Sequence, residues 1–132
     1  MAITRVFSPD APEPVDGMWS NCLVHDGLAY FSGLTARNAN LVEIDGQDEY
    51  EQTRLILAKH KALVEAAGGS MADFVKLTIY VTNIANREMV WKARRESFEG
   101  NFPACSLVEV SSLAPGVLVE IEGIAHIGAS KS

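Results

Sequence analysis

The chain has 132 residues, of which 48% are hydrophobic and 21% are charged, a composition typical of one globular domain and too short for two separate cores. Its formal net charge of −6 argues against unspecific nucleic-acid binding, which relies on clustered Lys and Arg. No apolar run has the length that spans a bilayer, and no apolar leader is visible, so we expect a soluble cytoplasmic protein with the single domain 1–132.

Three strands are predicted in the first part of the chain. The β-branched and apolar residues 3–7 predict a short strand, and the prolines that follow predict an extended loop. Residues 20–25 and 28–32 are separated by Asp26-Gly27, two residues that tolerate the positive φ angles of a tight turn. These two segments therefore predict an antiparallel hairpin.

A loop and the longest helix are predicted next. The polar stretch after Gly33 predicts a loop, in which residues 41–44 form a short edge strand. From Asp48 to Ala67 apolar side chains recur at intervals of three and four residues, so we predict a helix with Asp48 as its N-cap. The predicted core-facing stripe consists of Leu55, Ile56, Ala58, the stem of Lys59, Ala62, Leu63 and Ala66.

A strand follows this helix after a turn. Ser70 and Asp73, three residues apart, predict the turn, and residues 74–83 alternate between apolar and polar side chains. This alternation is typical of a half-buried strand. Its predicted buried face consists of Val75, Leu77, Ile79 and Val81.

The last part of the chain predicts a helix and two strands. A charged helix is predicted over 86–98, and strands over 105–113 and 117–127 flank the turn residues 114–116. The order β-β-β-α-β-α-β-β predicts an α+β fold, a mixed sheet with two helices on one face. Because two helices leave the other face of the sheet bare, we expect neighbouring copies of the chain to cover it.

Glu120 and Glu122 alternate with apolar residues in the last predicted strand, which places both carboxylates on one face. A solvated strand face explains this pattern, because glutamate is seldom buried without a partner. The functional alternative is that one glutamate lies in a cleft and transfers a proton, which requires a pKa raised by burial or by its neighbour. The spacing leaves both interpretations open.

Neither cysteine has the spacing of a zinc site or a disulfide framework, so we treat Cys22 and Cys105 as free thiols. Cys105 follows Pro103-Ala104 at the start of a strand. A nucleophilic role would require a nearby base, for which the candidates are His25, His60 and His126. The alternative is a small buried hydrophobic residue, which is the usual role of free cysteine.

Further residues are typical of ligand sites, and each has a structural alternative. Gly33, directly after Ser32, would let a ligand approach backbone amides closely, or it ends the strand. Trp19 and Trp91 are rings of the kind that line small-molecule pockets and subunit contacts, or they fill the core.

Three segments together resemble the Rid family, also called YjgF or UK114. They are AYFSG at 29–33, QTRLILAKHKALVEAAGGSMADFVKLTIYVTNI at 52–84 and FPACSLVEVSSLAPGVLVEIEGIA at 102–125, and the match covers nearly the whole chain. The resemblance implies a chorismate-mutase-like α+β fold. It also implies a homotrimer in which the sheets form a barrel, with ligand clefts between subunits.

The resemblance implies an activity as well. Family members hydrolyse reactive imines and enamines to keto acids and ammonia without a cofactor, and some carry endoribonuclease or translation-inhibitor names. By position, Glu120 would orient water, Gly33 would line the pocket, and the backbone amide of Leu107 would help to hold a ligand carboxylate. Trp19 stands at the position where the family usually has an aromatic residue in the pocket. Trp91 stands approximately at the position where an asparagine is frequent in the family.

Cys105 stands where the family has a carboxylate-binding arginine. A thiol cannot make the bidentate, charge-assisted hydrogen bonds of a guanidinium, so the resemblance implies that the usual 2-imino acids are poor substrates. The pocket is then expected to be richer in aromatic surface and poorer in cations. Such a pocket favours a bulkier or less acidic ligand.

Two functions of different classes follow. The first is a hydrolytic deaminase of an imine, an enamine or a related small C=N compound, with water oriented by Glu120 and with no cofactor or metal. The second is a non-catalytic trimeric binding protein for small molecules. Ribonuclease action has only family names in its favour, and the net charge of −6 counts against it. We expect neither nucleic acid nor membrane as a partner.

Overall fold

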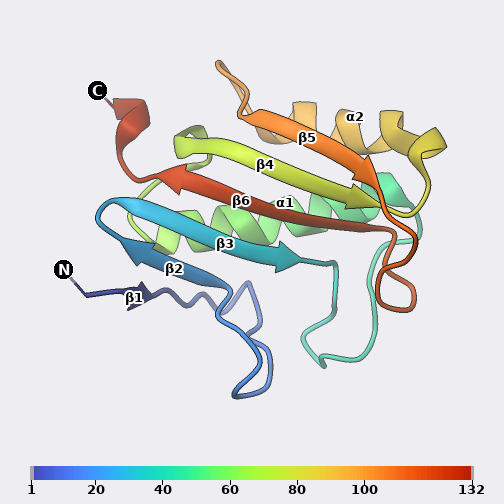
Figure 1. Cartoon of the computed structure of the whole chain (residues 1–132), viewed down its shortest axis with the longest axis horizontal. Helices are drawn as coiled ribbons and strands as arrows, with labels where there is room; N and C mark the ends of the chain where they lie inside the picture. The colour runs from blue at the N-terminus through green and yellow to red at the C-terminus, as the bar shows by residue number, and fades with distance from the viewer. Residues whose placement is uncertain (1, 132) are drawn as a thin grey trace.

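The computed structural model describes residues 2–131, which form a mixed six-stranded sheet with two α-helices on one face (Figure 1). The strands are β1 Thr4–Arg5, β2 Cys22–His25, β3 Leu28–Leu34, β4 Phe74–Val81, β5 Ala104–Glu109 and β6 Val119–His126. The helices are α1 Glu49–Ala66 and α2 Arg87–Ser97, and the short 3-10 helices are η1 Met71–Asp73, η2 Ile84–Asn86 and η3 Ala129–Lys131. The predicted α+β class and the predicted order of elements are confirmed.

The strands lie in the order β1-β2-β3-β6-β4-β5. Neighbouring strands are antiparallel except β4 and β5, which run parallel and are joined by α2, because a parallel pair needs a crossover connection. Figure 1 shows α1 and α2 behind the sheet, with the front face bare. No helix within residues 2–131 has the length and apolar character needed to cross a membrane.

The hairpin formed by β2 and β3 follows the prediction. Asp26 and Gly27 both have positive φ angles, 56° and 81°, which the tight turn requires. The predicted first strand is shorter than expected, since only Thr4 and Arg5 pair with β2. The predicted edge strand at 41–44 is wrong, because this segment forms only one bridge, between Arg37 and Ile44.

Helix α1 begins and ends as predicted, but its buried face is different. Asp48 is the N-cap, and its carboxylate accepts a hydrogen bond of 2.8 Å from the amide of Glu51. Ala58 and Ala66 are exposed, so the predicted stripe is wrong at both. The buried face consists of Glu49, Gln52, Thr53, Ile56, Leu57, His60, Leu63 and Val64.

Two polar residues of α1 belong to this buried face because each has hydrogen-bond partners outside the helix. Gln52 donates to the carbonyl oxygens of Gly46 and Gly116, at 3.2 and 3.1 Å, and its own oxygen accepts from Leu118 N at 2.9 Å. The Nε2 atom of His60 lies 2.8 Å from the carbonyl oxygen of Ile121. Buried polar groups with such partners are stable in a core.

Strand β4 confirms the predicted alternation at three of the four positions: Leu77, Ile79 and Val81 are fully buried. Val75 is 47% exposed, so the prediction is wrong there. The pairing with β6 shifts in register between Phe74 and Lys76, and Phe74 is buried in place of Val75.

Candidate functional site

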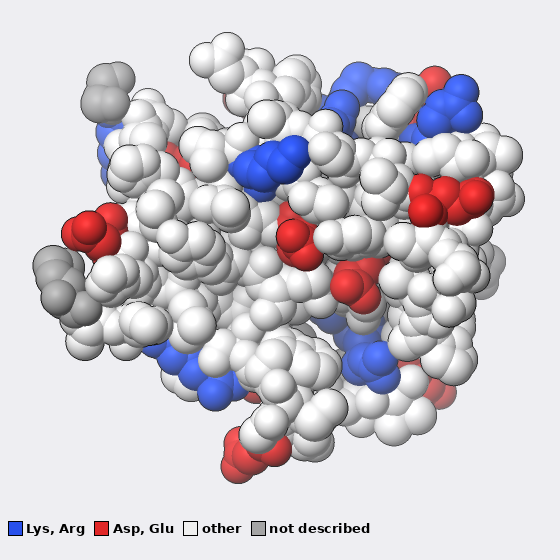
Figure 2. Space-filling model, viewed as in Figure 1, with Lys and Arg blue, Asp and Glu red and all other residues white. Residues whose placement is uncertain are grey.

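Two carboxylates lie on the face of the sheet away from the helices. Val119 and Ile121 of β6 are fully buried, whereas Glu120 and Glu122 alternate with them and are half-buried, which confirms the predicted shared face. The hydroxyl of Tyr80 on β4 donates to Glu122 Oε1 at 3.2 Å. Figure 2, which views this face, shows a mostly uncharged surface with acidic side chains near its middle.

Gly33 lies against the Glu120 side chain because of a bulge in β3. Phe31 pairs with Gly123 and Leu34 pairs with Ile121, so β3 has one residue more than β6 at this point. A Cβ atom at residue 33 would overlap the carboxylate of Glu120 and would lie 3.0 Å from its Cδ. Glycine at this position therefore leaves the space that the carboxylate occupies.

The surroundings of Glu120 favour its protonated form. Burial, and then the negative charge of Glu122, raise the pKa of Glu120 above its ordinary value. A carboxyl group whose pKa is closer to neutrality both accepts and donates protons more readily at physiological pH.

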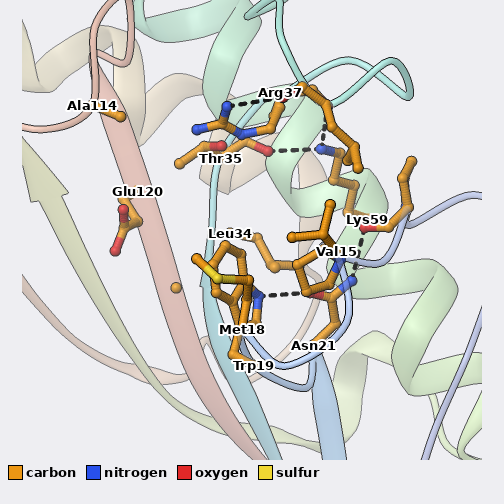
Figure 3. A pocket seen from close by; sticks show the side chains of 14 residues that line it. Val15, Met18, Trp19, Asn21, Leu34, Thr35, Arg37, Lys59, Ala114 and Glu120 are labelled. Atoms are coloured by element: carbon orange, nitrogen blue, oxygen red, sulfur yellow. Dashed lines mark hydrogen bonds between the residues drawn. The ribbon is translucent and has the colours of Figure 1, made fainter.

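A cavity of about 450 Å³ opens beside Glu120 (Figure 3). Gly33 and Glu120 form one part of its wall. Met18, Trp19 and Leu34 form an apolar part, and in Figure 3 these three side chains lie together. The volume and the mostly apolar wall are typical of a small-molecule site.

The segment that carries Trp19 is held in place by hydrogen bonds. The ring nitrogen of Trp19 donates to Asn21 Oδ1 at 3.1 Å, and the buried Asn21 side chain donates to the carbonyl oxygen of Pro12 at 3.0 Å. The hydroxyl of Ser32 donates to the carbonyl oxygen of Ser20 at 2.5 Å. Ser32 therefore has a partner in this segment, and the indole ring of Trp19 is positioned before a ligand binds.

Arg37 and Lys59 also line the cavity, although neither was predicted as a site residue. Lys59 Nζ donates to the carbonyl oxygens of Thr35 and Arg37, at 2.8 and 2.7 Å. Burial lowers the pKa of Lys59, and the charge of Asp45 partly opposes this effect. The position of Lys59 inside the predicted core-facing stripe of α1 could have indicated a site residue. Arg37 lies in a polar loop, where no sequence pattern indicates that it lines a cavity.

Ser32 does not line the cavity, and three further predicted site residues lie away from it within one chain. Cys105 and Leu107 of β5 pair with Leu77 and Ile79, and both side chains pack on the core on the helix-covered side. Trp91 lies on α2, where its ring centre is 5.9 Å from the guanidinium carbon of Arg87. The cavity of a single chain therefore contains Trp19, Gly33 and Glu120 from the predicted set.

Comparison with known proteins gives a match over most of the chain. Residues 9–127 match the family described as Endoribonuclease L-PSP. A RutC family protein of Pyrococcus horikoshii is 34% identical over 121 residues, which are 92% of this chain and 95% of that protein.

Solved structures of similar proteins share the fold. A protein of unknown function from Pseudomonas aeruginosa has 38% sequence identity and a TM-score of 0.86, and the match covers 96% of this chain and 94% of that one. YyfA of Yersinia pestis, described as a protein of the conserved Rid family, has 36% identity and a TM-score of 0.88, over 96% of this chain and 100% of that one.

Proposed function

This chain belongs to the Rid family, the Endoribonuclease L-PSP family of proteins, and from that premise we propose that it hydrolyses an imine, an enamine or a related small C=N compound. The observation that carries the proposal is the half-buried carboxylate of Glu120, which lies against Gly33 in the wall of a cavity and has a raised pKa. A proton-transferring group in a sheltered cavity is what this hydrolysis needs.

The reaction needs one water molecule and no external oxidant or reductant. The imine nitrogen first takes a proton from solvent. As the water oxygen then attacks the C=N carbon, the carboxylate of Glu120 accepts a proton from the water, which gives a neutral carbinolamine. Glu120 next returns this proton to the amino nitrogen, the C–N bond breaks as ammonia leaves, and the hydroxyl group releases its proton to solvent, so that a carbonyl compound remains. One carboxyl group thus serves as base and then as acid.

The wall of the cavity supports a substrate with an apolar part. Met18, Trp19 and Leu34 offer a surface that selects by shape and burial. Cys105 stands in place of the arginine that would hold the carboxylate of the usual 2-imino acids, and its side chain packs on the core. We therefore expect the smallest 2-imino acids to be poor substrates.

The distribution of the predicted site residues supports a site shared between subunits. Leu107 and Trp91 lie away from Glu120 within one chain, and β5 is an edge strand of the sheet. A second copy that docks on the bare face of the sheet would bring its own β5 to the cavity. We expect a homotrimer, the assembly that the family resemblance implies.

The experiment is an ammonia-release assay with imines generated in place by an amino acid oxidase. We expect the protein to accelerate ammonia release from at least one imine with an apolar side chain, and Glu120→Gln to abolish the effect. Glu65→Gln is the matched control, because Glu65 is exposed on α1 and its surface ion pair with Lys61 contributes little to stability. Equal rates for wild type and Glu120→Gln would refute the role of Glu120.

The alternative function is a trimeric small-molecule binding protein without catalysis, which is favoured by the loss of an arginine at residue 105. The variant Cys105→Arg separates the two. Gain of 2-iminopropionate hydrolysis would mean that the catalytic groups are intact and that only specificity has changed. If neither this variant nor the wild type releases ammonia from any imine tested, the binding function is the better account.

A further inference from the structure

We propose that Arg37, positioned by Lys59, is an anion-binding site in the wall of the cavity, and that the ligand of this protein carries a carboxylate or a similar anionic group. The inference rests on the proposed function only in that both use the same cavity. It places the anion in the cavity wall of one chain, away from residue 105, which does not line this cavity.

The first observation is that the two cations have no ion-pair partner. Within residues 2–131, neither Arg37 nor Lys59 forms an ion pair, although both are half-buried. Asp45, the carboxylate whose charge acts on Lys59, accepts hydrogen bonds from Asn38 Nδ2 at 3.2 and 3.0 Å. Removing charges from water is unfavourable without compensation, so a bound anion would stabilise this pair.

The second observation is that Arg37 has N–H donors to offer. A guanidinium has five N–H donors. Among the described residues, Arg37 makes one side-chain hydrogen bond, from Nη1 to the carbonyl oxygen of Leu41, and at 3.3 Å it is long. Figure 3 shows the guanidinium turned toward the strand that carries Glu120. Its geometry can grip a carboxylate through two parallel hydrogen bonds.

Lys59 holds the backbone that presents Arg37. Its ammonium group donates to the carbonyl oxygens of Thr35 and of Arg37 itself, at 2.8 and 2.7 Å. These two bonds connect α1 to the segment after β3 and fix the point from which the Arg37 side chain extends. Lys59 is therefore a positioning residue that also adds positive charge at this side of the cavity.

The third observation is that the cations and Glu120 act at separate points. Arg37 does not form an ion pair with Glu120, and the pKa of Glu120 is raised by burial and by Glu122. A ligand can therefore place its anionic group on Arg37 while its apolar part packs on Trp19. The carboxylate of Glu120 then stays available to the reacting group.

The test compares two probes of nearly the same shape, phenylacetate and its neutral analogue phenylacetamide, by titration calorimetry with the full chain. Because the two differ mainly in charge, we expect phenylacetate to bind at least about tenfold more tightly, or about 1.4 kcal/mol. Equal affinities, or no measurable binding of phenylacetate, would overturn the proposal.

Variants locate the effect. Arg37→Gln removes the charge but keeps a side-chain donor for the carbonyl oxygen of Leu41, and we expect it to weaken phenylacetate binding about tenfold, to the level of phenylacetamide. Arg95→Gln is the matched control, because Arg95 is exposed in the last turn of α2 and the same charge is removed. A folded Arg37→Gln that binds phenylacetate like the wild type would overturn the proposal. If Arg37→Gln does not fold, Arg37→Lys is used in its place. Because this variant keeps the positive charge, the proposal requires that it still binds phenylacetate more tightly than phenylacetamide.

The positioning role of Lys59 has its own readout. In a Lys59→Met background, which keeps an apolar stem, Arg37→Gln is expected to weaken phenylacetate binding by less than it does in the wild type. Additive effects would show that Lys59 does not act through Arg37. The binding measurements do not depend on catalysis. If Glu120→Gln releases ammonia like the wild type, the proposed function fails. The affinities for phenylacetate and phenylacetamide still show whether Arg37 binds an anion.

Discussion

The carboxylate of Glu120 occupies the space into which a side chain at residue 33 would extend. The two residues come from neighbouring strands, and the bulge in β3 brings them together. The position of the proposed catalytic acid therefore depends on the absence of a side chain at Gly33.

Gly33→Ala tests this dependence. The new methyl group would displace the flexible end of Glu120, so we expect a loss of stability below about 1 kcal/mol but a fall in the rate of ammonia release of about tenfold or more. Thermal unfolding and kcat/KM measure the two effects.

Gly123→Ala is the contrasting control, because its Cβ would lie 2.9 Å from Leu77 Cδ2 and 3.0 Å from Phe74 Cε1 in the core. That variant is expected to lose about 1 to 3 kcal/mol of stability. Full activity of Gly33→Ala would contradict the prediction.

Glu122→Gln tests the electrostatic coupling on the bare face. The negative charge of Glu122 helps to raise the pKa of Glu120, so its removal is expected to lower that pKa. The limb of the pH–rate profile that reports the pKa of Glu120 should therefore move to lower pH, whether Glu120 acts as the base or as the acid. The measurement is kcat/KM as a function of pH for the wild type and the variant. A limb that stays in place or moves upward is incompatible with the coupling.

His60 is expected to make the fold sensitive to mild acid. Burial lowers the pKa of His60 from 6.5 to about 4, although the hydrogen bond with the carbonyl oxygen of Ile121 partly opposes this shift. The folded state therefore keeps His60 neutral while the unfolded state binds a proton, and stability that is present above pH 6.5 is lost as the pH falls toward about 4. The expected loss is about 3 kcal/mol over this window.

Urea unfolding across the same pH window measures this loss. His60→Gln keeps a donor for the carbonyl oxygen of Ile121 and should remove most of the pH dependence. His126→Gln, at the exposed end of β6, is the matched control and should keep it. Retention of the full pH dependence in His60→Gln would assign the effect to other groups.

The bare face of the sheet is expected to mediate assembly. Val108 of β5 and Tyr30 of β3 are 42% and 47% exposed on this side, where apolar surface is costly in water. Val108→Lys is expected to reduce the trimer to smaller species in light scattering and to lower activity with it. Val42→Lys, in an exposed loop, is the control for assembly. A wild-type chain that stays monomeric at micromolar concentration speaks against the shared site.

The features predicted from sequence are those whose causes are local. Asp26-Gly27 forms the hairpin turn because both residues accept positive φ angles, and Asp48 caps α1 because its carboxylate reaches an amide three residues later. The shared face of Glu120 and Glu122 follows from the period of a strand. Each of these depends only on neighbours along the chain.

The features that the sequence did not reveal depend on contacts between distant segments. His60 is buried in α1 because its partner, Ile121, comes from the last strand. Val75 is exposed because the pairing of β4 with β6 shifts beside it, which no period in β4 indicates. Arg37 lines the cavity in a loop whose backbone accepts a hydrogen bond from Lys59 of α1, 22 residues further along the chain. Hydrophobic pattern alone contains none of this information.

The single amide of Gln52 has a consequence for protein engineering. It fastens the end of the loop after β3, through Gly46, and the turn before β6, through Gly116, to the first turns of α1. A combinatorial library can therefore vary residues 38–43, which include Leu41 of the cavity wall, while the end of this loop stays fastened to α1 through Gly46. The same library should leave Gln52 untouched, because its loss would release both loops at once.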